Sequence, residues 1–178
     1  MIWNIGKIRH FLTRDAAERL VHAFISSCLD NLNSLLTGVP DYLIHRLQLI
    51  QNTAARIITR TKQREHITPV LHSLHWLPIK QRIDYKIALL TFNCLHGLAP
   101  QYLIELIELY VPTRTLRSSS ECMLVERSAR TVRYGQRSFS YYAPKLWNRL
   151  PKQIRDCDNK NDFKGLLKTF LFTEAYSS

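Results

Sequence analysis

The chain has 178 residues, of which 46% are hydrophobic, so it can form one domain or two small ones without disulfide or metal staples. Its net charge of +11 and pI near 9.8 favour a polyanionic partner, above all nucleic acid or an anionic membrane surface. No segment approaches the ~20 apolar residues of a membrane span, and the N-terminal segment is too charged for a signal peptide. The sequence therefore predicts a soluble intracellular protein of the nucleus or cytoplasm.

Two helices are predicted at the start of the chain. Residues 1–12 form a short helix in this interpretation, because isoleucines recur at every third position and Phe11 follows. Thr13 is a good N-cap for the second helix, since its hydroxyl can accept a backbone N–H of the first turn. That helix should end before Gly38 and Pro40. Its expected buried face consists of Ala16, Leu20, Ala23, Phe24 and Cys28.

A third helix is predicted after Pro40, with Asp41 as its cap. Its apolar positions step by four and three, as on one face of a helix. These positions are Leu43, Leu47, Ile50, Ala54 and Ile57. The polar face and the basic tail comprise Arg46, Gln51, Asn52, Arg56, Arg60, Lys62 and Arg64. A solvated face is the simpler interpretation, and a helix that lays Arg and amide side chains on a phosphate backbone is the sharper one.

Residues 66–103 contain the clearest helix boundaries. Thr68-Pro69 opens a short helical turn, and Pro78 opens a long helix that Gly97 closes. Proline suits the first turn of a helix, and glycine suits the position just past its end. The expected buried stripe of the long helix is Ile79, Ile83, Ile87, Leu90 and Cys94. Pro100 opens a further helix whose apolar side is Leu103, Leu106, Ile107 and Tyr110.

Residues 112–152 differ in character, since nine Lys/Arg stand against two acidic residues, a surplus of seven. Helical periodicity is lost, and Met123–Val125 and Thr131–Tyr134 predict a short β-hairpin. Arginine interleaved with aromatic residues suits stacking on unpaired bases together with phosphate neutralisation. The alternative is that the rings anchor an irregular segment on the core, and Trp147 and Leu150 are assigned to that role.

The chain closes with a helical turn at Pro144–Leu150, another after Pro151, and a last helix capped by Asn161 or Asp162. The expected buried side of the last helix is Phe163, Leu166, Leu167, Phe170 and Leu171, and the tail after Thr173 should fray. The fold class predicted is mostly α. A helical bundle (residues 1–111) is followed by a basic, partly irregular segment (residues 112–178) that packs on the bundle.

Residues that could form a catalytic or metal centre do not stand at the required spacings. The cysteines include no C-x-x-C pair, which predicts free thiols rather than a zinc site. His72 and His75 have no carboxylate or cysteine beside them at ligand spacing, so they are interpreted as structural or surface residues. A Gly-rich phosphate loop is absent from the sequence, as is an adjacent pair of aspartates for two metal ions. The prediction is a non-catalytic binding module without a cofactor.

Several long motifs resemble one family. They are ERLVHAFISSCLDNLNSLLTGVP, RLQLIQNTAARIIT, HITPVLHSLHWLPIKQRIDYKIALLTFNCLHGLAP, RSFSYYAPKLWNRLP and FKGLLKTFLF. Together they resemble the C-terminal, post-palm region of LINE-type, jockey-like non-LTR retrotransposon reverse transcriptases, and the resemblance covers nearly all 178 residues. It departs locally at Asn31-Leu32-Asn33, where relatives often carry Tyr-Cys-Asn.

The resemblance implies a thumb-like helical region that holds a template–primer duplex. In that family the paired aspartates of the palm hold the metal ions of the RNA-directed DNA polymerase. This chain lacks such a pair, so it is expected to be a truncated fragment without enzyme activity. The expected partners are RNA or an RNA–DNA hybrid, with the missing palm domain or another protein as a further partner, and no membrane. The predicted nucleic-acid contacts are Arg46, Arg56, Arg60, Lys62, Arg64, Arg130, Arg133, Tyr134 and Arg137.

Two alternatives to nucleic-acid binding stay open. One is a helical protein-interaction module whose charge serves solubility, and loss of the palm would leave apolar faces of residues 1–36 uncovered for such a role. The other is a relic of a decayed element that has no selected function.

Overall fold

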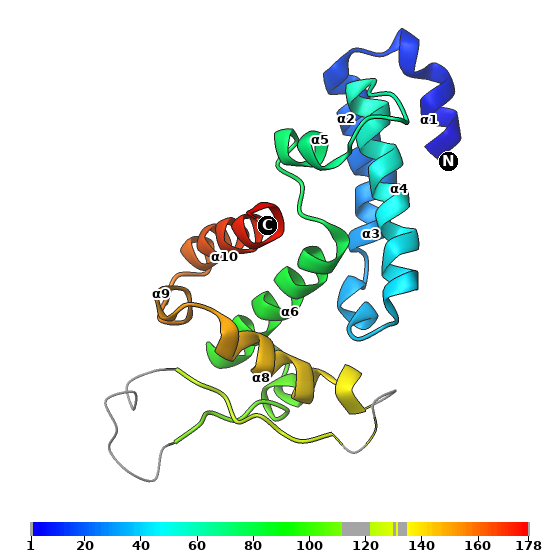
Figure 1. Ribbon diagram of the computed structural model, residues 1–178. Helices are drawn as coiled ribbons and strands as arrows, with labels where there is room; N and C mark the ends of the chain where they lie inside the picture. The colour runs from blue at the N-terminus through cyan, green and yellow to red at the C-terminus, as the bar shows by residue number, and fades with distance from the viewer. Residues whose placement is uncertain (1, 112–121, 130, 132–134, 178) are drawn as a thin grey trace. The chain divides into compact units, whose positions relative to one another are not determined.

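The computed structural model describes residues 2–111, 122–129, 131 and 135–177 (Figure 1). Most of these residues are helical, which confirms the predicted fold class. The chain divides into two compact units. The first comprises Met1–Leu35, Val39–Arg82 and Leu171–Ser178, and the second comprises Leu36–Gly38 and Ile83–Phe170. The division predicted at residues 111 and 112 rests on charge and periodicity, and it stays a prediction.

The first unit begins with helix α1 (Ile2–Ile8), a 3-10 turn at Arg9–Phe11 and helix α2 (Arg14–Val21). Thr13 caps α2 as predicted, since its Oγ1 accepts a hydrogen bond from the backbone N–H of Ala16 at 3.2 Å. A π-helical segment (His22–Ser26) and helix α3 (Ser27–Asp30) continue the same helix, and a 3-10 turn follows at Asn33–Leu36.

The buried face predicted for this helix is wrong by about one residue. Ala17, Val21 and Ile25 are buried, whereas Phe24 and Cys28 are exposed. Seven of the ten residues 16–25 are apolar, so hydrophobic periodicity could not select one face. The i→i+5 bonds of the π-helical segment also change the turn on which the prediction relied.

Helix α4 (Asp41–Thr59) lies beside α1 and α2. Pro40 occupies its cap position and Asp41 is the first helical residue, so the predicted cap is misplaced by one residue. Gln51 was expected on the outer face but is only 1% exposed, because its Nε2 donates to the carbonyl oxygen of Leu77 at 2.9 Å. Ile50, expected inside, is 42% exposed. The buried face of α4 therefore differs from its apolar pattern, and it includes an amide whose partner, the Leu77 carbonyl, is 26 residues away.

Helix α5 (Thr68–Ser73) begins at Thr68-Pro69 as predicted and closes over the core of the first unit. The buried members of that core come from five separate segments. They are Ile5, Val21, Ile25, Ala54, Ala55, Ile58, Leu71 and Trp76. The start of α6 is held in the same unit by an ion pair in which Arg82 Nε donates to Asp30 Oδ1 at 2.8 Å.

The second unit contains most of helix α6 (Ile79–Leu95), helix α8 (Phe139–Arg149) and helix α9 (Lys152–Arg155). The boundaries predicted for α6 are confirmed, since it starts after Pro78 and ends before Gly97, which has a φ of +66°. The core is built on three rings. Phe92 and Phe163 stack with centroids 4.4 Å apart, and the Trp147 ring lies 5.7 Å from Phe163.

The C-terminal part of the second unit agrees with the sequence in most of its core, although Leu166, predicted to be buried, is 45% exposed. It differs from the sequence in its helix ends. Trp147 and Leu150 are buried, at 0% and 2% exposed, which confirms their assignment to the core. Helix α8 spans eleven residues rather than the single turn predicted, with Pro144 inside it. Asn159, not Asn161 or Asp162, caps helix α10 (Lys160–Tyr176), since its Oδ1 accepts the backbone N–H of Asn161 at 2.8 Å.

The segment after Pro100 is less helical than predicted. Helix α7 (Gln101–Ile104) is a single turn, and Leu109 forms an isolated antiparallel bridge with Leu124. Tyr110 N–H donates to the Met123 carbonyl at 2.9 Å, and Val125 N–H donates to the Glu108 carbonyl at the same distance. The predicted strand around Leu124 therefore pairs with residues 108–110. Its predicted partner lies outside the described residues apart from Thr131, which is not in a strand.

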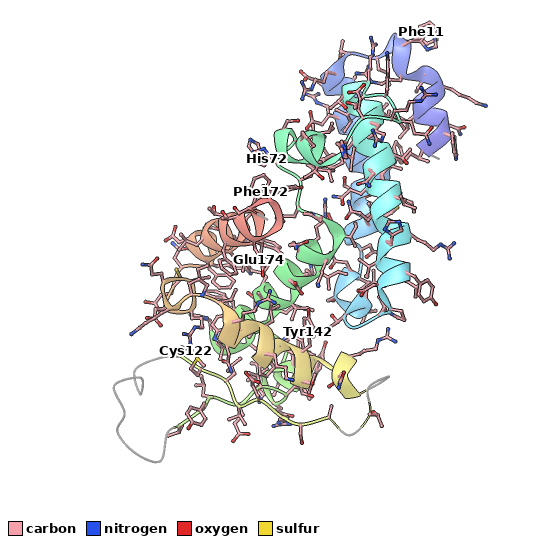
Figure 2. All side chains as sticks on the ribbon, in the orientation of Figure 1. Phe11, His72, Cys122, Tyr142, Phe172 and Glu174 are labelled. Carbon is pink, nitrogen blue, oxygen red and sulfur yellow. The ribbon has the colours of Figure 1, made fainter. Side chains whose placement is uncertain are left out.

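The last residues of α10, Leu171–Tyr176, belong to the first unit and remain helical where fraying was predicted. The Phe172 ring lies 5.0 Å from the His72 ring; both residues are labelled in Figure 2. The Tyr176 hydroxyl donates to the carbonyl oxygen of Trp76 at 2.5 Å, and burial raises the pKa of Tyr176 to about 12. This docking explains why the tail is ordered, because an unattached helix end has no such contacts.

Tyr176→Phe tests this docking through its pH dependence. Because burial raises the pKa of Tyr176 to about 12, its contribution is fully present below the unfolded-state value of about 10 and is lost as pH rises towards 12. Urea unfolding of the wild-type chain at pH 7, 9 and 11 should show a steeper loss of stability above pH 10 than the variant shows. Tyr102→Phe, at a ring 67% exposed, is the control and should follow the wild type. Parallel curves for wild type and Tyr176→Phe would contradict the docking.

Candidate nucleic-acid interface

The candidate interface is built at the C-terminal end of α4. The helix stops where Arg60 takes the left-handed conformation, with a φ of 57°. The last carbonyl groups of a helix lack partners within it. Arg9 supplies the missing hydrogen-bond donors, because its Nε donates to the Ile57 carbonyl at 2.7 Å and its Nη2 to the Ile58 carbonyl at 2.8 Å. A cation is favoured at this end of a helix, so Arg9 fixes the N-terminal segment to α4.

The loop after α4 is held by Arg56. Its Nη1 donates to the Lys62 carbonyl at 2.7 Å, and its Nη2 donates to the Glu65 carbonyl at 2.9 Å. The Lys62 backbone N–H in turn donates to Glu65 Oε1 at 3.2 Å. The planar guanidinium, with several donors in fixed directions, suits this clamp. Arg56 was predicted to contact phosphate, and the structure gives it a loop-ordering role.

Positive charges crowd each other at this end of α4. Arg60 Nη2 lies 3.4 Å from the Arg9 carbonyl oxygen to which it donates. The pKa of Arg9 is lowered, first by burial of its guanidinium and then by the charge of Arg60. Residues 56–64 contain no acidic side chain, and the carboxylate of Glu65 already accepts the Lys62 N–H. An anion placed here would therefore meet a field that the chain leaves largely uncompensated.

Four of the predicted contacts are exposed on the first unit. Arg60 and Lys62 stand at the end of α4, Arg64 follows in the loop, and Arg46 lies about 21 Å back along the helix, by a rise of about 1.5 Å per residue. Within the described part of the chain, the charged groups of Arg46, Lys62 and Arg64 make no hydrogen bond or ion pair. These groups are thus available to bind phosphate.

The remaining predicted contacts belong to the second unit. Arg137 follows a short 3-10 turn (Gly135–Arg137), and its Nε donates to the Thr37 carbonyl at 3.2 Å. Its stem packs on Gly38, where an added Cβ would stand 2.7 Å from Arg137 Cγ, and Gly38 has a φ of +64°. Arg137 is therefore partly committed to this turn. Arg130, Arg133 and Tyr134 lie outside the described residues.

Two arginines have structural roles that the sequence did not reveal. Besides Arg9, Arg155 is buried at 7% exposed, and its Nε donates to the Leu150 carbonyl at 3.0 Å. The Cys122 carbonyl receives both Arg155 Nη1 at 3.4 Å and the indole N–H of Trp147 at 2.9 Å. In both cases the carbonyl partners are distant in sequence or lie in an irregular segment. No residue pattern marks such pairs in advance.

Polar groups elsewhere in the described residues do not assemble into a metal site. No group of three or more His, Cys, Asp or Glu in that part of the chain could hold a metal ion. His72 and His75 lie against the Phe172 ring, at centroid distances of 5.0 and 5.8 Å. The buried carboxylate of Asp84 accepts the Tyr142 hydroxyl at 2.8 Å in the second unit. These contacts order the helices and leave the basic end of α4 as the strongest candidate site.

Comparison with known proteins found no family model, no curated protein and no solved structure that matches this chain.

Arg9→Gln tests the role of Arg9 at the end of α4. The change removes charged hydrogen bonds to the Ile57 and Ile58 carbonyls, and bonds of this kind contribute about 1.5–3 kcal/mol. We expect the free energy of unfolding, measured with urea by circular dichroism, to fall by roughly that amount. Lys7→Gln removes the same charge from an exposed position on α1 and should have little effect. An equal decrease in the two variants would mean that net charge, not these bonds, matters.

Proposed function

We propose that this chain is a nucleic-acid-binding module that grips RNA or an RNA–DNA hybrid through the basic end of α4. It would do so as the thumb-like, post-palm part of a LINE-type reverse transcriptase, without a catalytic site of its own. One observation carries the proposal. Arg60, Lys62 and Arg64 are exposed together where residues 56–64 contain no carboxylate.

The loop geometry supports binding to phosphates rather than a merely solvated surface. Arg56 and Glu65 hold the loop from both sides, so Lys62 and Arg64 project from an ordered backbone. An ordered array of cations loses less conformational entropy on binding than a flexible tail does. Arg46 extends the array along the helix in the direction that a backbone of regularly spaced phosphates would follow. We infer that the contacts are mainly to phosphates and depend little on base sequence.

The class of partner follows from charge and from the family resemblance. None of the helices in the described part of the chain is long and apolar enough to cross a membrane. The resemblance of the HITPVL-x-SLHWLP and APKLWN-x-LP motifs favours a template–primer duplex, and a place in the nucleus or cytoplasm with it. In that setting a palm domain would supply the chemistry, and this chain would position the duplex.

A salt titration with a triple variant tests the proposal. Removing one phosphate-binding cation reduces the slope of log affinity against log salt by about 0.7–0.9. The combined variant Arg60→Gln, Lys62→Gln and Arg64→Gln should therefore lower the slope by about 2–3 and weaken binding to RNA and RNA–DNA hybrid alike. Filter binding between about 50 and 200 mM salt provides the measurement.

The matched control removes the same number of positive charges from other helices. Lys80→Gln, Lys86→Gln and Lys168→Gln together remove three exposed cations from α6 and α10. This control should keep most of the wild-type slope. Identical slopes for the two triple variants would show that net charge, not the end of α4, determines binding. Absence of wild-type affinity at low salt would remove the proposal altogether.

A protein-interaction module is the second candidate, and exposed apolar side chains favour it. Leu32 and Leu35, in the connection between α3 and α4, are 65% and 70% exposed, and Phe24 is 47% exposed. Leu32 also has a φ of 54°, a backbone conformation unusual for leucine. Exposed apolar groups mark a surface for association where they form one patch.

Leu32→Asn tests this second candidate without straining the backbone, because asparagine tolerates the left-handed conformation better than leucine does. If Leu32 lies in a contact surface, the wild-type chain should self-associate with increasing concentration in sedimentation velocity. The variant should shift the equilibrium towards monomer. Leu98→Asn, at a leucine 60% exposed in the second unit, is the control. A wild-type chain that stays monomeric at all concentrations would argue against this candidate.

A further inference from the structure

Two aromatic rings at the N-terminal segment of the first unit face solvent. Trp3 on α1 is 78% exposed, and Phe11 in the following 3-10 turn is 81% exposed. Figure 2 shows the Phe11 ring at the tip of the N-terminal segment, pointing away from the helices. The same segment does bury an apolar residue, since Ile5 is 5% exposed in the core. The exposure of Trp3 and Phe11 is thus selective, because the inward face of α1 is already in use.

The segment that carries these rings and the C-terminal end of α4 contain cations and no acidic residues. Residues 2–14 and 56–64 carry seven Lys/Arg and no Asp or Glu. Asp15 and Glu65 adjoin the two segments, and Glu65 is engaged with the Lys62 N–H. Lys7, His10 and Arg14 are exposed and lie within four residues of a ring in sequence, and the His10 and Phe11 ring centroids are 3.8 Å apart.

The N-terminal segment is fastened to the basic end of α4. Arg9 stands two residues before Phe11, and it donates to the carbonyls of Ile57, Ile58 and Leu12. Gly6 lies against α4, since a Cβ added there would be in ordinary van der Waals contact with Ile57 Cδ1, at 3.7 Å. Phe11 therefore follows, two residues on in the chain, the Arg9 carbonyl that the Arg60 guanidinium reaches.

We propose that Trp3 and Phe11 stack on unpaired bases of a single-stranded nucleic acid whose phosphates are bound by the surrounding cations. This inference rests on the proposed nucleic-acid binding and extends it to a second kind of contact. Exposed rings set in a positive surface are the two components of sequence-tolerant single-strand binding. A regular duplex keeps its bases stacked within the helix, so only the phosphate contacts would serve both kinds of nucleic acid.

An anionic membrane surface fits the same residue types less well. A helix that lies in a membrane interface inserts a continuous apolar face. The apolar face of α1, with Ile5 at its centre and Ile2 beside it, packs on the protein core. What remains exposed is Trp3, Ile8 and Phe11. The exposed cation Lys7 lies between the two rings in sequence, which suits bases alternating with phosphates.

Phe11→Ala separates stacking from charge. Loss of one base–aromatic stack costs about 1–3 kcal/mol, so affinity of the full chain for a fluorescent oligouridylate or oligothymidylate should fall at least about 5-fold in anisotropy titrations. Affinity for an RNA duplex of equal length should stay within about 2-fold, since no phosphate contact is removed. Tyr42→Ala is the matched control, because Tyr42 is 65% exposed in the first turn of α4, at the end opposite Arg60.

Tryptophan fluorescence gives an independent measurement. The chain has three tryptophans, and Trp76 and Trp147 are buried at 6% and 0% exposed. Quenching by added oligouridylate should therefore come from Trp3, and Trp3→Phe should lose the quenching while keeping a ring that can stack. Quenching of Trp3 by phosphatidylserine vesicles, with none by the oligonucleotide, would overturn the inference in favour of a membrane.

The variants distinguish failure of this inference from failure of the proposed function. If Phe11→Ala leaves single-strand affinity unchanged while the triple variant at Arg60, Lys62 and Arg64 weakens duplex binding, the stacking surface is refuted and the basic grip stands. If Phe11→Ala weakens single-strand binding and the triple variant affects neither ligand, the basic grip at α4 is refuted. An equal decrease in affinity for single strand and duplex in Phe11→Ala would refute selective stacking.

Discussion

The first unit depends on how the C-terminal end of α4 is closed. A helix that ends in a left-handed arginine leaves carbonyl groups without partners, and burial of such groups would be costly. The Arg9 guanidinium meets the Ile57 and Ile58 carbonyls from a segment about fifty residues earlier in the chain. The same contact orients the 3-10 turn that carries Phe11. One charged side chain thus sets the helix end, the position of α1 and the surroundings of Arg60.

The basic character of the chain has two physical origins. Some arginines serve the fold by donating to carbonyl oxygens, as Arg56 does to the loop and Arg155 to Leu150. Arg82 also serves the fold, but it donates to the carboxylate of Asp30. Other cations, including Lys62 and Arg64, are exposed and have no such task among the described residues. The net charge of +11 therefore overstates the charge that has no task within the fold.

The candidate site was only partly predictable. The long basic helix ending near Arg60 follows from periodicity, since its apolar positions and its charges alternate at helical spacing. The different roles of Arg56 and Arg60 do not follow from periodicity. They depend on whether loop carbonyls lie within reach of a guanidinium. Arg9 had no local signal of any kind, since its partners are 48 and 49 residues away. The burial of Gln51 had no local signal either, because the carbonyl to which its Nε2 donates is 26 residues away.

The sequence by itself determined several helix ends, because proline, glycine and capping residues act through backbone conformation within a few residues. Thr13, Pro78 and Gly97 all mark the ends found in the structure. Tertiary structure alone decided which faces are buried in α2 and α4, and it decided that Leu124 pairs with Leu109. It also decided which cations remain exposed. These outcomes depend on partners distant in sequence, and the free energy of such contacts exceeds the small differences between alternative local arrangements.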